Sequence, residues 1–114
     1  MEWCVHIAGP PDLDGEPALA RFATLETSGK LHDSVRRAAE SVAAAFGDVR
    51  FSRCAFGNEF CEHLTPEPGA VAAAAGAAAA RGMGFTLLTP YVSDAGLARL
   101  RAIFNILDDA EVVF

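Results

Sequence analysis

Residues 49–89 decide the fold: they begin with VRFSRCAFG (49–57), continue with TPEPGAVAAAAGAAAARGMG (65–84) and end with FTLLT (85–89). The first and last of these segments are short, apolar and bounded by glycine, which is typical of β-strands. The middle segment is almost entirely alanine, which has the highest helix propensity and small side chains that let a helix lie close against a sheet. The order strand, helix, strand predicts a right-handed βαβ unit with parallel strands.

The ends of the alanine-rich helix carry recognisable signals. Thr65 is a good N-cap residue, and Pro66 is tolerated in a first turn, so we expect the helix to begin there. Gly82 and Gly84 are expected to end it. Because alanine side chains bury little area, this helix gains little hydrophobic stabilisation of its own.

Upstream, residues 3–7 (WCVHI) read as a short strand that stops at Gly9-Pro10-Pro11. Residues 17–22 could form a short helical piece, and 27–29 read as loop. A helix is predicted from Asp33, capped by Asp33 or Ser34 and closed by Gly47. Its apolar residues recur at spacings of three and four and are expected to line one face: Val35, Ala38, Val42 and Phe46.

Downstream of residue 89, the segment 90–92 reads as a loop and Ser93 as the N-cap of a third helix. The expected apolar stripe of this helix consists of Leu97, Leu100, Phe104 and Leu107. The final residues, EVVF (111–114), are predicted to form a fourth strand. An apolar strand at an uncovered sheet edge favours association, so this segment also predicts a homodimer formed through the open edge strand.

Strands and helices alternate at intervals of about 30 residues, which indicates a parallel α/β sheet. An open doubly wound sheet and a (β/α)8 barrel share this pattern, and the barrel needs about 250 residues. The 114 residues therefore predict one domain, 1–114, that forms the N-terminal half of a TIM-like (β/α)8 barrel and continues in a longer protein. The alternative is a complete small α/β protein with an open four-stranded sheet.

Composition excludes several classes of protein. Hydrophobic residues make up 52% and charged residues 21%, which argues against a disordered chain. The formal charge of −6 makes nucleic acid an unlikely partner held by bulk charge. The apolar run at 70–80 is too short and too weakly hydrophobic for a bilayer, and the acidic N-terminus lacks the pattern of a secretory signal. We therefore expect a cytoplasmic protein with no membrane partner.

The three cysteines, Cys4, Cys54 and Cys61, do not fit a four-ligand zinc pattern. Cys4 and Cys54 lie in predicted strands, where a small buried apolar residue is the expected role. Cys61 lies in a polar loop, where a neighbouring histidine could stabilise its thiolate.

Candidate functional side chains follow the predicted strands, at whose carboxyl ends parallel α/β proteins place their sites. They are His6, then Asn58, Glu59, Cys61, Glu62 and His63, and finally Thr89 and Tyr91. Glu59 stands out because a carboxylate near a strand end needs a partner or a ligand. Each of several others has a plainer alternative: a hydrogen-bonded core histidine for His6, ordinary polar residues for Glu62 and His63, and a hydrophobic-edge cap for Tyr91.

The chain lacks a glycine-rich phosphate loop, a Gly-x-Ser-x-Gly elbow and an HExxH motif.

Three segments, FGNEFCEHL (56–64), GFTLLTPYVSDAGL (84–97) and EVVF (111–114), resemble the collagenase-like peptidase family, number thirty-two of the unclassified (U) peptidases. The resemblance covers 49–114 well, 1–9 loosely and 10–48 hardly at all. It implies a TIM-like barrel and a peptidase-type hydrolase, although some relatives serve oxygen-independent hydroxylation of ubiquinone precursors or RNA bases.

Under this hypothesis Glu59 and His63 are the catalytic candidates, and Asn58, Thr89 and Tyr91 contact the substrate. Cys61 matches the first of four cysteines that hold a [4Fe–4S] cluster in some relatives. The other three would lie beyond residue 114, so a cluster is implied for a longer form and none is expected for this chain alone. The chain as it stands is expected to be inactive.

Two other functions stay open at this point. The chain could be a non-enzymatic α/β module that self-associates through its last strand. It could also be a thiol-dependent hydrolase that uses Cys61 and His63. Peptide, quinone precursor and RNA all remain substrate classes, although the acidic balance disfavours RNA.

Overall fold

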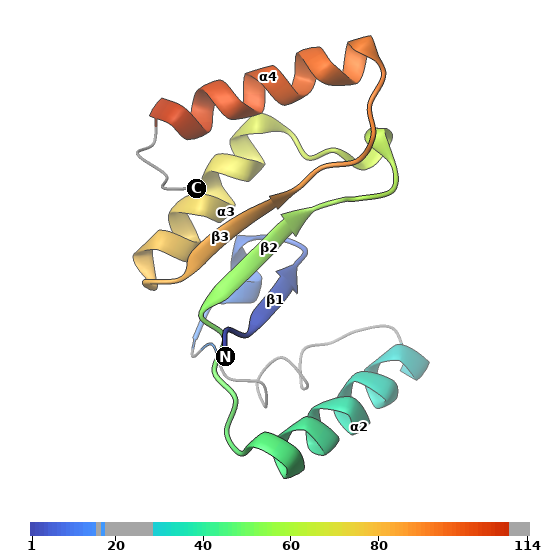
Figure 1. Cartoon of the computed structure of the whole chain (residues 1–114), viewed down its shortest axis with the longest axis vertical. Helices are drawn as coiled ribbons and strands as arrows, with labels where there is room; N and C mark the ends of the chain where they lie inside the picture. The colour runs from blue at the N-terminus through green and yellow to red at the C-terminus, as the bar shows by residue number, and fades with distance from the viewer. Residues whose placement is uncertain (16, 18–28, 110–114) are drawn as a thin grey trace.

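The protein is built on a three-stranded parallel sheet, which we describe from a computed structural model (Figure 1). The structure describes residues 1–15, 17 and 29–109. The elements in chain order are β1 (Cys4–Ile7), the 3-10 helix η1 (Pro10–Leu13), α2 (Gly29–Phe46), β2 (Arg53–Gly57), the 3-10 helix η2 (Glu62–Leu64), α3 (Pro68–Ala80), β3 (Gly84–Leu88) and α4 (Asp94–Asp109). The α/β class predicted from the sequence is confirmed.

The strands lie in the order β1-β2-β3, so strands that follow one another in the chain are neighbours in the sheet. Cys54 on β2 lies between Val5 on β1 and Phe85 on β3. All three strands run the same way, and their carboxyl ends therefore meet at one edge, which we call the carboxyl edge. The predicted fourth strand (111–114) lies outside the described residues, as does most of the predicted helical piece at 17–22. Homodimer formation through that strand stays a prediction.

Helix α3 covers one face of the sheet with small side chains, as its alanine content predicted. Its buried residues are Val71, Ala74, Ala75 and Ala78. They pack in one hydrophobic cluster with Cys54 and Phe56 of β2. Because alanine offers little area, larger side chains from other elements complete the core, and three of them come from helix α4, which packs on α3 (Figure 1). Each large α4 side chain in this core contributes roughly 1.5–3 kcal/mol relative to an exposed one.

The α4 stripe differs in part from the sequence prediction. Leu100 and Leu107 are buried as expected, and so is Ile103, which the prediction omitted. Leu97 and Phe104 are 40% and 41% exposed, because they lie on the flank of the helix beside the buried stripe. The predicted Ser93 cap is confirmed, since Ser93 Oγ accepts a hydrogen bond from the Gly96 amide at 3.3 Å.

Helix α2 corrects the sequence prediction most. It begins at Gly29, so Asp33 and Ser34 lie inside the helix and do not cap it. Ala38 and Phe46 are exposed and Val42 is half-buried, while Ala39 is buried; the side chain of Val35 is outside what the structure describes. Figure 1 shows the cause: α2 lies beyond β1, away from α3 and α4.

The carboxyl end of α2 is where the helix meets the rest of the protein. The Phe46 ring packs edge-on against Trp3, just before β1, with 5.3 Å between ring centroids. Gly47 ends α2 with a φ of +78°, which confirms its predicted role, because only glycine adopts that conformation at little cost. The chain then enters β2 through Val49 and Phe51, which are buried although the strand itself begins later than predicted, at Arg53.

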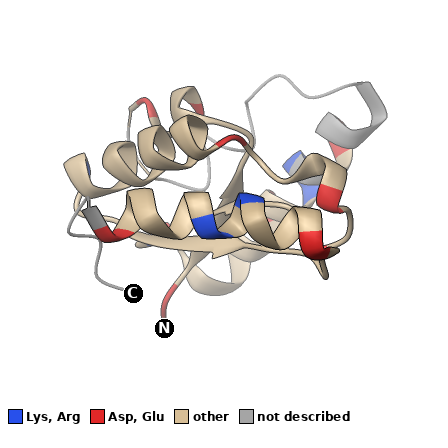
Figure 2. Ribbon diagram, turned by 90° about the horizontal axis from the view of Figure 1, so that it is seen from above, with Lys and Arg blue, Asp and Glu red and all other residues tan. Residues whose placement is uncertain are grey.

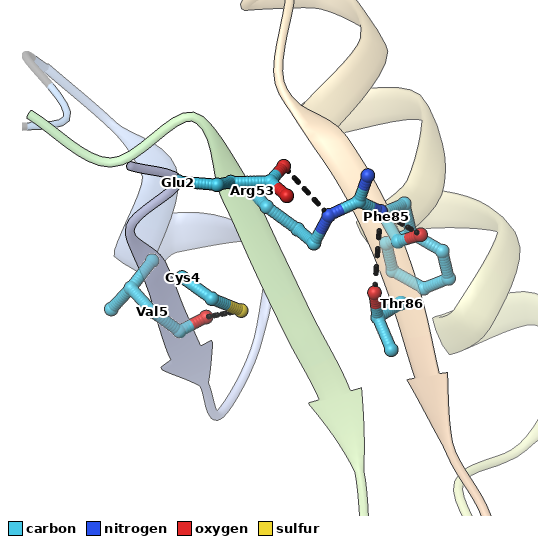
Figure 3. A network of polar contacts seen from close by, with 6 residues as sticks. All are labelled: Glu2, Cys4, Val5, Arg53, Phe85 and Thr86. Atoms are coloured by element: carbon cyan, nitrogen blue, oxygen red, sulfur yellow. Dashed lines mark hydrogen bonds and ion pairs between the residues drawn. The ribbon is translucent and has the colours of Figure 1, made fainter.

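The second face of the sheet carries mostly polar and small side chains. Alternation along the strands places Cys4, His6, Arg53, Ala55, Thr86 and Leu88 on it. Arg53 spans this face at the amino end of the strands (Figure 3). Its Nε donates to Glu2 Oε1 at 2.9 Å, and its Nη1 donates to the Phe85 carbonyl at 3.2 Å and to Thr86 Oγ1 at 3.3 Å.

No helix in the described part of the chain is both long enough and apolar enough to cross a membrane.

The close approach of β2 and β3 at the carboxyl edge generates a stability prediction. Gly57 has a φ of +123°, and a Cβ built on it would lie 2.3 Å from the Leu88 carbonyl oxygen. Gly57→Ala is expected to lower the free energy of unfolding by about 3 kcal/mol, because backbone strain and a backbone clash add. Urea denaturation followed by circular dichroism measures the change.

Gly82→Ala is the matched control. Gly82 also has a positive φ, +65°, but nothing lies within 4 Å of a Cβ added there. Strain alone should cost about 1 kcal/mol at this position. Equal destabilisation by the two substitutions would contradict the close approach at Gly57.

Candidate functional site

The loops that follow the three strands bring most of the predicted site residues to the carboxyl edge. His6 lies near the end of β1, the loop after β2 carries Asn58, Glu59, Cys61 and His63, and Thr89 and Tyr91 follow β3. This placement follows from parallel strands in chain order. The roles of these residues in catalysis or binding stay predictions, and their individual geometries differ widely.

Asn58 organises the loop after β2. Its Oδ1 accepts hydrogen bonds from the amides of Phe60 and Cys61, each at 2.8 Å. Its own amide donates to the Leu88 carbonyl of the neighbouring strand at 3.3 Å. An asparagine that bonds the backbone two and three residues ahead fixes a tight turn. Asn58 was predicted as a substrate contact, and the structure shows that its carbonyl oxygen holds the loop.

Glu62 joins this loop to the start of α4. Its Oε2 accepts a hydrogen bond from the Ser93 amide at 2.7 Å. The absence of a side chain at Gly96 makes room for it, because a Cβ there would lie 2.6 Å from Glu62 Oε2. The bonds from the Ser93 amide and hydroxyl lower the pKa of Glu62, and His63 and Arg99 add a smaller effect in the same direction. The sequence made Glu62 a candidate functional residue, with an ordinary polar residue as the alternative. Its contact with a helix cap 31 residues later has no local signal in the sequence.

Two cavities lie along the carboxyl edge. One of about 190 Å³ is lined by Glu62, His63, Ser93, Ala95, Gly96 and Arg99. The other, of about 410 Å³, lies at the ends of β1 and β2 and is lined by His6, Ile7, Ala8, Phe56, Gly57, Asn58, Leu64 and Pro66. The larger one combines four large apolar side chains with two polar ones, which is typical of small-molecule sites.

His6 belongs to the larger cavity rather than to the core. Its ring is exposed, and its Nε2 lies 3.2 Å from the Gly57 carbonyl oxygen. The expectation that a strand histidine is a buried core residue is therefore wrong here. The reason is its place on the second face of the sheet, which the polar residues occupy.

Glu59, Thr89 and Tyr91 are exposed. The Tyr91 side chain is fully exposed, as is most of Phe60, which is 92% exposed. The carboxylate of Glu59 was expected to need a partner or ligand because of its proximity to a strand end. The loop carries Glu59 into solvent, where water solvates the charge, so its carboxylate does not need a protein partner there. A ligand at Glu59 stays a prediction.

The three cysteines lie in different surroundings. Cys54 is fully buried, as predicted, whereas Cys4 is exposed, because β1 is an edge strand and Cys4 lies on its polar face. Burial raises the pKa of the Cys54 thiol and also that of Cys4, where the Arg53 charge opposes it. Cys61 is half-buried. Within the described residues no hydrogen bond joins it to His63, so the thiol–imidazole pair of a thiol hydrolase is not assembled there.

The described residues do not fit a [4Fe–4S] cluster. Such a cluster needs four cysteine thiolates, and Cys61 lies at the carboxyl edge, whereas Cys4 and Cys54 lie toward the amino ends of β1 and β2. Throughout the described ranges, no three His, Cys, Asp or Glu side chains are grouped so that they could hold a metal ion.

Thr65 was predicted to cap α3, but the helix begins at Pro68, with Glu67 in the N-cap position. The two prolines explain the delay, because a residue before proline is pushed into the extended region. Thr65 precedes Pro66 with φ −59° and ψ 122°, and Glu67 precedes Pro68 with φ −66° and ψ 146°. The Thr65 hydroxyl is buried and has no hydrogen-bond partner among the described atoms.

The charges near the carboxyl edge are mostly negative. In α4, acidic residues stand at both ends and the arginines Arg99 and Arg101 in the middle (Figure 2). Arg99 lies 3.7 Å from Glu67, which is just before α3. With Glu59, Glu62 and Asp94 also at this edge, a polyanionic ligand is disfavoured there.

Comparison of the chain with protein-family models, with curated proteins and with solved structures found no match.

The Glu62 contact predicts a pH-dependent stability. A carboxyl whose pKa is lowered by folding stabilises the protein above its unfolded pKa, and that contribution is lost as the pH falls through the folded pKa. Glu62→Gln should therefore be less stable than the unmodified protein at about pH 7, and the difference should disappear at about pH 2–3. Urea denaturation across this pH range measures it.

Glu59→Gln serves as the control, because Glu59 is exposed in the same loop and no hydrogen bond or ion pair in the described part of the chain involves it. It should leave stability unchanged at both pH values. A Glu62→Gln effect of the same size at neutral and acid pH would show that the charge of Glu62 is not what stabilises the contact.

The cysteine environments predict an order of thiol labelling. In the folded protein Cys4 should react with N-ethylmaleimide and Cys54 should not, because the Cys54 side chain is 0% exposed. Mass spectrometry of proteolytic peptides reports each site, and urea-unfolded protein, in which all three should react, is the control. Native labelling of Cys54 as fast as that of Cys4 would contradict the packing of α3 on β2.

Proposed function

We propose that this chain supplies the first βα units of a TIM-like barrel and that the carboxyl edge of its sheet binds a peptide substrate. The observation that carries the proposal is the arrangement of the sheet. Its parallel strands lie in chain order, α3 packs on one face, and the other face carries polar and small side chains together with Leu88. In a barrel the helices cover the outer face and the second face points inward. Helix α3 fits this arrangement, whereas α2 lies beyond β1 (Figure 1).

The order of the strands fits a barrel. In a (β/α)8 barrel consecutive strands are neighbours, and the described strands run β1-β2-β3. The first three strands of a doubly wound sheet of order 3-2-1-4-5-6 have the same arrangement, so the proposal rests on the two faces of the sheet and not on strand order. On the second face, Arg53 bonds across the strands to Thr86, and Ala55 is small, which suits an interior filled by layers of side chains.

The carboxyl edge offers the kinds of groups that a peptide needs. Phe60, Leu64 and Tyr91 present exposed apolar surface in the loops of the carboxyl edge, and Leu64 also lines the larger cavity. Asn58, Thr89 and Tyr91 are the proposed substrate contacts. In a hydrolysis, Glu59 would take the proton of the attacking water and His63 would protonate the leaving amine as the carbon–nitrogen bond breaks. Hydrolysis needs the rest of the barrel, so binding is the activity that we assign to this chain.

Peptide binding predicts a localised response in nuclear magnetic resonance. Titrating ¹⁵N-labelled protein with peptides from denatured collagen should shift the amides of residues 56–64 and 88–92 and leave residues 36–46 of α2 unmoved. Tyr91→Ala should weaken binding about fivefold or more, because an exposed aromatic side chain at the edge loses its contact.

Phe104→Ala is the matched control, since Phe104 is a partly exposed aromatic residue on α4 and belongs to neither cavity. It should leave the affinity unchanged. Shifts confined to α2 or to the amino end of the sheet, or no shifts at all, would rule out peptide binding at the carboxyl edge.

A further inference from the structure

The larger cavity at the ends of β1 and β2 holds two polar side chains among apolar ones. Ile7, Phe56, Leu64 and Pro66 supply the apolar part of its lining, and His6 and Asn58 supply polar side chains. Ile7 is opposite Phe56 in the sheet register, so the floor of the cavity belongs to the regular sheet and not to a loop. The hydrogen bonds that the two polar side chains already make decide what else they can bind.

His6 presents a hydrogen-bond acceptor when its ring is neutral. Its Nε2 is 3.2 Å from the Gly57 carbonyl oxygen, and a carbonyl oxygen can only accept a hydrogen bond. Nε2 therefore carries the proton. In a neutral imidazole the other nitrogen, Nδ1, then has a lone pair and accepts. No group among the described residues donates to it.

Asn58 presents a hydrogen-bond donor. Its Oδ1 already accepts from the Phe60 and Cys61 amides, at 2.8 Å each. This fixes the orientation of the side-chain amide, because reversing it would place Nδ2 against two backbone donors. Nδ2 then keeps two hydrogens, and within the described ranges no acceptor bonds to them. Asn58 follows Gly57 directly, and the His6 ring is hydrogen-bonded to the Gly57 carbonyl, so both side chains are held at the end of β2.

We propose that this cavity recognises a neutral carboxamide carried on an apolar body. A carboxamide carbonyl can accept from Asn58 Nδ2 while its N–H donates to His6 Nδ1, and the apolar body lies against Phe56, Leu64 and Pro66. A carboxylate lacks the donor and would bring its charge into a largely apolar cavity, which is costly. This inference rests on the proposed binding role of the carboxyl edge and names the group that the edge selects.

Three ligands of nearly the same shape test the inference on the unmodified protein. Benzamide has both a donor and an acceptor, acetophenone has the acceptor alone, and benzoate has acceptors and a charge. We expect benzamide to bind roughly five- to tenfold more tightly than either of the others. Its titration should shift the amides of residues 6–8, 56–58 and 64 in the ¹⁵N spectrum.

Asn58→Asp tests the donor while keeping the loop. An aspartate oxygen still accepts from the Phe60 and Cys61 amides, but the second oxygen replaces the Nδ2 donor. Affinity for benzamide should fall about tenfold. Asn105→Asp makes the same chemical change on the exposed surface of α4 and should leave binding unchanged. His6→Phe keeps a ring in the cavity but removes the acceptor, and it should also weaken benzamide binding.

The outcomes separate this inference from the proposed function. Equal affinities for benzamide and acetophenone, or tighter binding of benzoate, would overturn carboxamide recognition even where collagen peptides still shift the carboxyl edge. If neither benzamide nor the peptides shift these residues, both proposals fail. If Asn58→Asp does not fold, the comparison of the three ligands on the unmodified protein decides alone.

Discussion

The close packing of α3 against the sheet is the constraint on which the rest of the structure depends. Ala74, Ala75 and Ala78 let the helix backbone lie near β2 and β3, and Cys54 fills the space beneath them with another small side chain. The same small side chains leave α3 with little apolar area of its own. Helix α4 is therefore needed as a second layer, and Ile103 and Leu107 are as fully buried as any residue of the sheet. Losing α4 would uncover α3, and with it the crossover from β2 to β3.

The two ends of β2 are fixed by different means. At the carboxyl end Gly57 lets the backbone pass close to Leu88, and Asn58 then bonds to the Leu88 carbonyl. At the amino end Arg53 reaches over Gly84 and bonds to the backbone and side chain of β3. The ion pair of Arg53 with Glu2 is 38% and 54% exposed, so it contributes about 0–1 kcal/mol. Backbone proximity, more than charge, holds the strands in register.

The sequence predicted the elements better than it predicted their packing. The strands at 3–7 and 85–89, the alanine helix and the Ser93 cap follow from propensity and capping, which act over a few residues. The wrong assignments of burial depend on distant residues. Phe46 and Ala38 are exposed because α2 lies beyond β1, and Cys4 is exposed because it is on the polar face of an edge strand. A periodic pattern shows that a helix has an apolar face, but not what that face will meet.

The same distinction applies to the candidate site. Sequence reasoning favoured Glu59 for its proximity to a strand end, yet the groups that the fold holds in place are Asn58, Glu62 and His6. The side chain of each bonds to a backbone group: Asn58 within its own loop, Glu62 at the α4 cap and His6 at the end of β2. A side chain fixed in this way keeps its remaining donors and acceptors in a constant direction, which is what selective binding requires. Glu59 and Tyr91 are exposed and can change rotamer freely, so they suit contacts that adapt to a ligand already held by the fixed groups.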